Sequence, residues 1–233
     1  MEPEDRKCAS RAESPLKSIK HVVVVMLENR SFDHMLGYLR LQGRMDIAGL
    51  DGSQFEVFEG VKYRASPLST TLFPVDPDHS WKAVRLQRES GYIHAFAERA
   101  GRAGVHPSLI MGYMGARASA RLPAYEYFAE HFAICDNYFA SVPGPTTPNR
   151  LYALAGTSEG DRRTSRLPRH TARTIFEHCA ANGTSWAYYY HDIPMLGLYL
   201  RHAVRPWQFR KFSSFASDVS RSVADVPEVM WID

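Results

Sequence analysis

A short run of β-branched residues is the feature that most restricts how this chain can fold. Residues His21 to Leu27 read HVVVVML, a continuous apolar stretch without the alternation of a half-exposed strand. Such a run is typical of a strand that is buried on both faces of a parallel sheet. We therefore expect a strand over Val22 to Leu27 in the interior of the sheet.

Polar residues follow this strand directly, in the sequence ENRSFDH from Glu28 to His34. In open α/β sheets, ligands bind at the carboxyl ends of the strands. The carboxylate of Glu28 and the amide oxygen of Asn29 are groups that hard divalent cations prefer. The alternative is that Glu28 pairs with Arg30 or caps the following helix, and the residues alone do not decide between these readings.

A second candidate site is the sequence GPTTPNR from Gly144 to Arg150, which leads into a predicted helix over Pro148 to Ala155 that Gly156 ends. A helix N-terminus attracts phosphate and stabilises negative charge that develops on a phosphoryl group. A hydroxyl there can act as a nucleophile once a metal ion or a base assists its ionisation. By itself, the motif is weak, because a threonine before a proline at a helix start, here Thr147, is far more often an ordinary helix cap. Arg150 is a candidate phosphate contact, although a salt-bridged arginine is the more common case.

A third candidate is the loop DPDHSW from Asp76 to Trp81, in which His79 lies between carboxylates. Such an imidazole suits proton donation to a leaving group or the holding of a phosphate oxygen. The more common case is a solvated loop histidine. Asp33 and His34 are interpreted as helix-surface or structural groups.

The remaining elements are predicted from periodicity and breaker residues. Residues 1–18 are expected to form a disordered tail, and residues 19–233 the N-terminal portion of one catalytic domain. That portion is expected to contain a long insertion loop over residues 40–77 with short β-like pieces such as Gln54 to Phe58. Helices are expected at Trp81 to Ala100, Ala124 to Phe132 and Arg173 to Ala181, and strands at Phe132 to Ala140, Ser185 to Tyr190 and Val229 to Asp233.

Composition excludes several classes of protein. The 28 basic and 25 acidic residues give a net charge of +3, which is too mild to indicate a nucleic acid partner but permits an anionic substrate. The three cysteines lack CxxC spacing, so neither a disulfide framework nor a zinc knuckle is indicated. No export signal or transmembrane segment is visible, which predicts a cytoplasmic protein as given, or a secreted or periplasmic one if the true start lies upstream.

The quoted motifs together resemble a known family of enzymes. The resemblance is to the bacterial phosphoesterase family, which includes alkaline-phosphatase-like phospholipases C and related acid phosphatases. It runs in the family's order from Ile19 to about Tyr190 and rests on the segments IKHVVVVMLENRSFDHMLGYL, DPDHSW, MGYM, LPAYEYFAEHFAICDNYFASVPGPTTPNRLYALAGTS and GTSWAYY.

This resemblance implies a fold and a set of site residues. The fold is an α/β, alkaline-phosphatase-like sandwich with a largely parallel central sheet, expected to be incomplete at its C-terminus. Glu28 and Asn29 would bind a divalent metal ion, and Thr146 would be the metal-bound nucleophile at the edge of the sheet where Glu28 lies. His79 would lie at the phosphate site.

Other residues of the GPTTPNR motif receive supporting roles from the same resemblance. Asn149 and Arg150 are assigned to substrate binding. Thr147 is the alternative nucleophile if the register is shifted by one residue.

The implied function is hydrolysis of a phosphate ester, with a phospholipid among the candidate substrates. Family members continue beyond the equivalent of Asp233 with a DxHPP-like and a DEHGG-like segment that supply further metal ligands, and this sequence contains neither. The alternative is therefore a truncated, inactive homologue that acts at most as a phosphate- or lipid-binding module.

Overall fold

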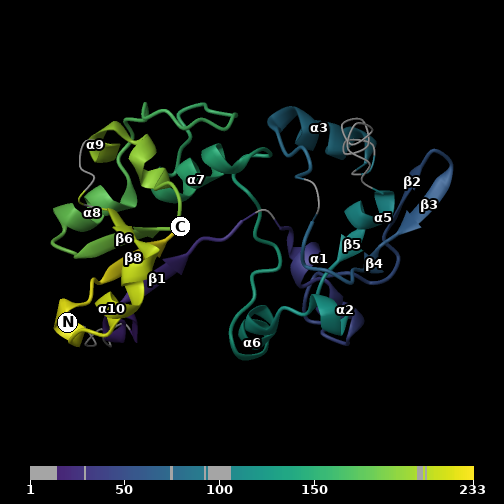
Figure 1. Ribbon diagram of the computed structural model, residues 1–233, viewed down its shortest axis with the longest axis horizontal. Coiled ribbons are helices and arrows are strands. Elements are labelled where there is room, and N and C mark those ends of the chain that lie inside the picture. The colour runs from purple at the N-terminus through teal and green to yellow at the C-terminus, as the bar shows by residue number, and fades with distance from the viewer. Residues whose placement is uncertain are drawn as a thin grey trace, which may run out of the picture. The chain divides into compact units, whose positions relative to one another are not determined.

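The computed structural model describes residues 15–28, 30–73, 76–91, 93, 106–203, 207 and 209–233. The chain divides into two compact units, one formed by Met1–Leu27 with Leu167–Asp233 and the other by Glu28–Arg166. Their helices and strands are labelled in Figure 1. Asn29, most of the predicted tail and the end of the helix predicted over Trp81 to Ala100 lie outside the described residues. No described helix is both long and apolar enough to cross a membrane.

The first unit is built on a parallel sheet of four strands. Strand order is β1-β8-β6-β7, and every neighbouring pair is parallel. The strands are β1 (Val22–Val25), β6 (Trp186–Tyr190), β7 (Phe209–Lys211) and β8 (Val229–Ile232). The predicted α/β class with a parallel sheet is confirmed, as are the strands expected at residues 185–190 and 229–233.

The predicted interior position of the first strand is wrong within the described residues. There, β1 pairs with β8 alone and lies at one end of the sheet. Val22, Val23 and Val25 are 49%, 46% and 57% exposed. The β-branched run determines that a strand forms, because these side chains favour extended backbone. Its place in the sheet depends on which other strands pair with it, and the run itself carries no such information.

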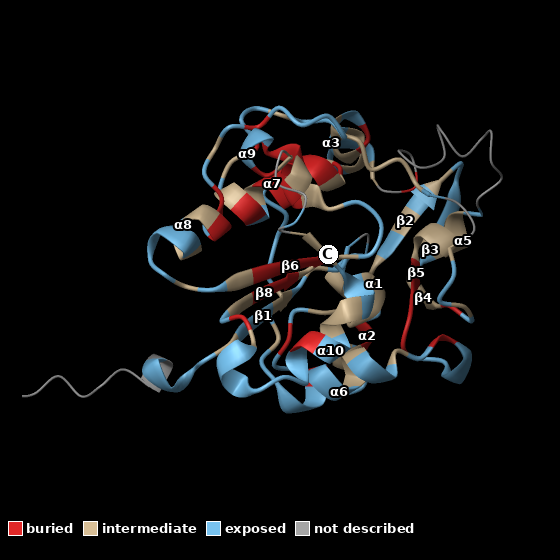
Figure 2. Ribbon diagram, turned by 60° about the vertical axis from the view of Figure 1, so that its left-hand side comes forward, coloured by how far each residue is buried: buried red, intermediate tan, exposed pale blue. Residues whose placement is uncertain are grey.

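The core of the first unit lies on the two faces of β6, whose buried residues Figure 2 shows in red. On one face, the ring of Tyr188 packs against Phe176 of α8 (Ile175–Ala181), with 5.7 Å between ring centroids. On the other face, Tyr189 packs edge-on against Phe215 of α10 (Phe215–Val219), at 5.2 Å. Successive strand residues point to opposite faces, so the two tyrosines fix one helix on each side.

Short elements connect these parts of the first unit. They are η1 (Pro15–Ser18), η3 (Met195–Leu198), α9 (Leu200–Ala203), η5 (Phe212–Ser214) and η6 (Val223–Asp225). At the carboxyl end of the sheet, Asp233 accepts hydrogen bonds from the hydroxyl of Tyr188 and from the main-chain N–H of Met195.

The second unit contains short helices and two small sheets. Its helices are α1 (Phe32–Met35), α2 (Tyr38–Leu41), α3 (Trp81–Ser90), α5 (Pro107–Ile110), η2 (Ala118–Ala120), α6 (Pro123–His131) and α7 (Thr146–Ala155). Its strands form an antiparallel pair, β2 (Phe55–Phe58) with β3 (Val61–Arg64), and a parallel pair, β4 (Ser66–Pro67) with β5 (Gly112–Tyr113). The predicted insertion loop over residues 40–77 thus contains a β-hairpin.

The strand predicted over Phe132 to Ala140 is absent, and this segment has irregular structure. Phe132, Tyr138 and Phe139 are 60%, 86% and 78% exposed. Within the segment, the carboxylate of Asp136 accepts a hydrogen bond from the main-chain N–H of Ala48 at 2.6 Å. An apolar run needs a neighbouring strand to become a strand itself, and none of the described residues pairs with this one.

Candidate functional site

The GPTTPNR motif forms the N-terminal turn of α7, a helix of ten residues. The helix begins at Thr146, two residues before the predicted start, so Pro148 is its third residue. Proline is tolerated there because the first helical N–H groups have no partner within the helix. The predicted end is confirmed, since Gly156 caps the helix in the left-handed conformation with φ of 70°.

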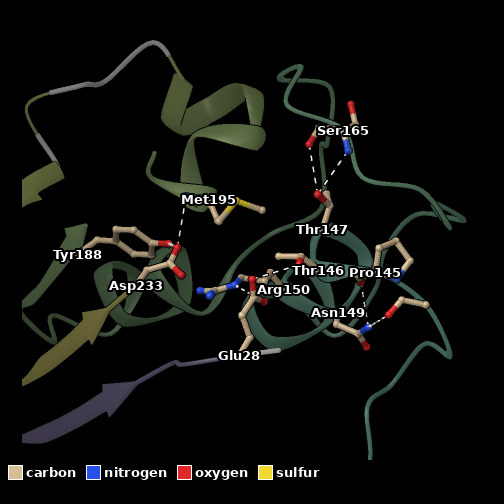
Figure 3. Close-up of polar contacts among 11 residues, drawn as sticks. Glu28, Pro145, Thr146, Thr147, Asn149, Arg150, Ser165, Tyr188, Met195 and Asp233 are labelled. Carbon is tan, nitrogen blue, oxygen red and sulfur yellow. Dashed lines mark hydrogen bonds and ion pairs between the residues drawn. The ribbon is translucent and has the colours of Figure 1, made fainter. Parts of the chain in front are cut away.

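Asn149 closes the loop that leads into this helix. Its side-chain amide donates to the carbonyls of Val142, Gly144 and Pro145 at 2.9, 3.2 and 3.1 Å. Its Oδ1 accepts from the N–H of Val142 at 2.9 Å. These bonds hold the loop against α7 and thereby position Thr146 (Figure 3).

Thr146 and Arg150 both contact Glu28, although more than a hundred residues separate them from it in the sequence (Figure 3). The hydroxyl of Thr146 donates to Oε1 of Glu28 at 3.1 Å, and Nε of Arg150 donates to Oε2 at 3.2 Å. Residues four apart lie on the same face of a helix, so one carboxylate reaches both. The predicted meeting of Glu28 and Thr146 is confirmed.

The positive charge of Arg150 balances the negative charge of the Glu28 carboxylate at this partly buried position. The Glu28 side chain is 30% exposed and that of Arg150 only 9%, so their ion pair is largely shielded from water. Neither alternative considered for Glu28 is realised, because it does not pair with Arg30, and the cap of α1 is the hydroxyl of Ser31. Arg150 therefore forms an ion pair with Glu28. The contact of Arg150 with substrate stays a prediction.

The interpretation of Thr147 as a helix cap is wrong. Its side chain is buried, and its hydroxyl donates to the carbonyl of Ser165 and accepts from the Ser165 N–H, both at 3.3 Å. The residue before the helix is Pro145, which offers no side-chain cap. Because the helix begins two residues early, Thr147 lies in its first turn and turns away from the Glu28 side.

The His79 loop packs against the GPTTPNR loop. Nδ1 of His79 lies 2.8 Å from the carbonyl of Pro77 and 3.5 Å from the carboxylate of Asp76. The helix α3 begins two residues after His79, at Trp81. A Cβ atom added to Gly144 would lie 3.6 Å from Cα of Trp81. The fold thus places two motifs that are more than sixty residues apart in the sequence side by side within the second unit.

His79 also lines a cavity of about 740 Å³. Its other polar residues include Arg30, Asp33, His34 and Asp76. Sequence reasoning interpreted Asp33 and His34 as surface or structural groups and missed that they face a cavity. The available signal was the polar sequence itself, in which Arg30, Asp33 and His34 stand within five residues around the first turn of α1.

A hard divalent cation fits the type of donor atom that meets at Glu28. The carboxylate of Glu28 and the hydroxyl of Thr146 are oxygen donors, which such ions prefer. The described residues hold no cluster of three or more histidine, cysteine, aspartate or glutamate side chains that would complete a metal shell. Asn29, the third predicted ligand, lies outside the described residues.

Relatives with known names match most of this chain. Non-specific phospholipase C1 of Arabidopsis thaliana is 33% identical over 221 residues, which cover 85% of this chain and 39% of that protein. Phospholipase C A of Mycobacterium tuberculosis is 30% identical over 201 residues, which cover 75% of this chain and 38% of that protein. The chain spans about two fifths of the length of these relatives.

A third relative and a family model agree with these similarities. Hemolytic phospholipase C of Pseudomonas aeruginosa is 31% identical over 151 residues, which cover 60% of this chain and 19% of that protein. The model described as the phosphoesterase family matches residues 19–230, which include the strand β1, the Glu28 segment, the His79 loop and the GPTTPNR motif. With its parallel α/β sheet and with Glu28 and Thr146 in contact, this chain belongs to the phosphoesterase family.

Proposed function

We propose that this chain carries the nucleophile of a phosphate ester hydrolase, and that the nucleophile is Thr146. The observation that carries the proposal is the hydrogen bond from the Thr146 hydroxyl to Glu28 at the N-terminus of α7. A hydroxyl at this position lies where a helix attracts phosphate, and its partner is a carboxylate able to bind a cation. The family and its phospholipase C relatives support the same reaction class.

The first step transfers the phosphoryl group to the protein. Oγ1 of Thr146 attacks phosphorus, the bond from phosphorus to the alcohol oxygen breaks, and a phosphothreonine forms. The Thr146 hydroxyl releases its proton to solvent, and His79 gives a proton to the departing oxygen. Main-chain N–H groups in the first turn of α7 stabilise the charge on the non-bridging oxygens.

The second step releases phosphate. Water attacks the phosphothreonine, the bond between Oγ1 and phosphorus breaks, Oγ1 takes a proton from solvent, and His79 recovers a proton from the attacking water. Asn149 holds the loop and Arg150 holds Glu28, so both act on the substrate through these neighbours. A divalent cation held by Glu28, Asn29 and Thr146 would favour ionisation of the hydroxyl and neutralise phosphoryl charge.

The proposed substrate class is supported by the three relatives described above, all of which are named as phospholipases C. We propose a phosphodiester of a phospholipid as the first candidate and a phosphate monoester as the second. A second function, binding of phosphate or lipid without turnover, is favoured by the lack of a complete metal shell among the described residues.

Trapping of the intermediate tests this function. The purified chain with a divalent cation is mixed with a phosphate ester labelled on phosphorus, quenched in acid and mapped by peptide analysis. We expect label on Thr146, none in Thr146→Ala, and a reduced amount in Thr146→Ser, which keeps a hydroxyl. Thr147→Ser should leave the label in place, because its hydroxyl faces Ser165. Label on another residue would overturn the assignment, and binding without any label would support the second function.

A further inference from the structure

The cavity beside α1 contains a guanidinium that the proposed mechanism does not use. Arg30 lines this cavity together with His34, His79 and Phe73. Apolar side chains complete the wall, namely Leu50, Ala65, Pro77, Ile110, Met111 and Tyr113. The cavity of about 740 Å³ is large enough for a small organic ligand with a charged group.

Arg30 is held in place by uncharged partners. Its Nη1 lies 3.1 Å from Nε2 of His34, and its Cζ lies 5.6 Å from the centroid of the Phe73 ring. No carboxylate in the described part of the chain forms an ion pair with it. A guanidinium fixed by a neutral acceptor and an aromatic face keeps its full charge for an incoming anion.

His34 is suited to hold Arg30 because its ring stays neutral. Burial lowers the pKa of His34, the charge of Arg30 lowers it further, and a hydrogen bond with the main chain of Gly112 opposes both. A guanidinium only donates hydrogen bonds, so in the neutral ring Nε2 is the acceptor and the proton lies on Nδ1. Nε2 can therefore accept from Arg30, and the arginine keeps its orientation.

Two carboxylates, those of Asp33 and Asp76, line the same cavity and reduce its positive charge. The carboxylate of Asp76 lies 3.5 Å from Nδ1 of His79 and faces that ring. Asp33 lies against the main chain of Gly37: a Cβ atom added to Gly37 would lie 2.7 Å from Oδ1 of Asp33. Desolvation raises the pKa of Asp33. Asp33 does not pair with Arg30, so it opposes an anion without blocking the guanidinium.

We propose that Arg30, positioned by His34 and Phe73, binds a phosphate oxyanion in this cavity. The apolar wall formed by Leu50, Ile110 and Met111 would contact the organic part of the same ligand. The identity of the anion as phosphate rests on the proposed function. The presence of an anion site rests on the contacts of Arg30 alone.

Opposite charge changes at neighbouring positions test the site. Inorganic phosphate is titrated into the purified chain at low ionic strength, and binding is followed by calorimetry and by the amide signals of Met111 and Gly112. Arg30→Ala should weaken binding by about 10-fold or more, because a charge-assisted hydrogen bond is lost. Asp33→Asn should tighten it several-fold by removing a repelling charge, and Arg30→Lys should lie between wild type and Arg30→Ala.

Matched variants separate positioning from charge. His34→Leu should weaken phosphate binding although Arg30 is retained, and His34→Gln should recover part of it by restoring an acceptor. Arg85→Ala is the control, because Arg85 is an exposed arginine of the same unit that pairs with Glu89 outside the cavity. Unchanged affinity in Arg30→Ala, or weaker binding in Asp33→Asn, would overturn the proposal.

The outcome is independent of turnover. Phosphate binding that depends on Arg30, in a protein without label on Thr146, would leave this site standing and refute the nucleophile. Label on Thr146, together with a phosphate affinity that does not change in Arg30→Ala, would support the nucleophile and refute the Arg30 site.

Discussion

Neighbouring threonines of the GPTTPNR motif have separate tasks. The hydroxyl of Thr146 faces Glu28, and that of Thr147 bridges the N–H and the carbonyl of Ser165. The two residues begin the same helix, but consecutive helical positions are rotated by about 100°. One rotation step is therefore enough to separate a candidate nucleophile from a structural bridge.

Stability should report the bridge made by Thr147. Thr147→Val keeps the shape of the buried side chain but leaves the Ser165 N–H and carbonyl without this partner, so we expect a loss of about 1–3 kcal/mol in the free energy of unfolding. Thr147→Ser keeps the hydroxyl and should lose less. Urea unfolding followed by circular dichroism measures both. A Thr147→Val variant as stable as wild type would show that the bridge contributes nothing.

Among the elements of the first unit, α10 is tied to the sheet by one buried carboxylate. Asp218 accepts hydrogen bonds from the hydroxyl of Tyr189 in β6 and from Arg210 in β7, both at 2.9 Å, and pairs with Arg221 at 2.7 Å. Burial alone would raise the pKa of Asp218, but these hydrogen bonds and the two positive charges outweigh it and hold the pKa below its ordinary value of 3.8.

This lowered pKa predicts how stability depends on pH. A carboxyl whose pKa is lower in the folded than in the unfolded state stabilises the fold above its ordinary pKa, and this contribution disappears as the pH falls through the folded value. We expect the free energy of unfolding to fall below about pH 4, with a shallower decline in Asp218→Asn. At pH 7, that variant should lose about 1–3 kcal/mol, because a neutral amide replaces a charged acceptor. Parallel declines in both proteins would exclude Asp218 as a source of the pH dependence.

On the scale of the whole molecule, apolar surface remains open. Parallel sheets are normally covered on both faces, yet three valines of β1 are about half exposed. Phe132, Tyr138 and Phe139 in the second unit are also exposed. Exposed apolar residues therefore occur in both units.

Dye binding should detect this surface. The purified chain is expected to raise the fluorescence of anilinonaphthalene sulfonate, because contiguous apolar patches bind it. The double substitution Val23→Thr with Val25→Thr should lower the signal while preserving the strand, since threonine also favours extended backbone. Val61→Thr, at a residue 52% exposed in the separate β2–β3 hairpin, is the control for general loss of apolar surface. Fluorescence indifferent to the double substitution would exclude β1 as the binding surface.

The sequence by itself determined the class of elements and the chemistry of the motifs. The strands β6 and β8 and the end of α7 at Gly156 follow from side-chain types and spacing over a few residues, whereas the pairing of Glu28 with Thr146 was expected from the family resemblance. Local preferences of this kind act within one turn or one strand, so they can be read directly from the chain.

Only the tertiary structure decided which distant groups meet. The ion pair of Glu28 with Arg150 joins residues 122 positions apart, the Thr147 bridge depends on where the chain returns at Ser165, and the position of β1 depends on its pairing with β8. The cavity that joins Arg30 and His34 to the His79 loop has the same origin. Such partners are chosen by packing and by the need to satisfy buried polar groups, and neither is encoded in the residues next to them.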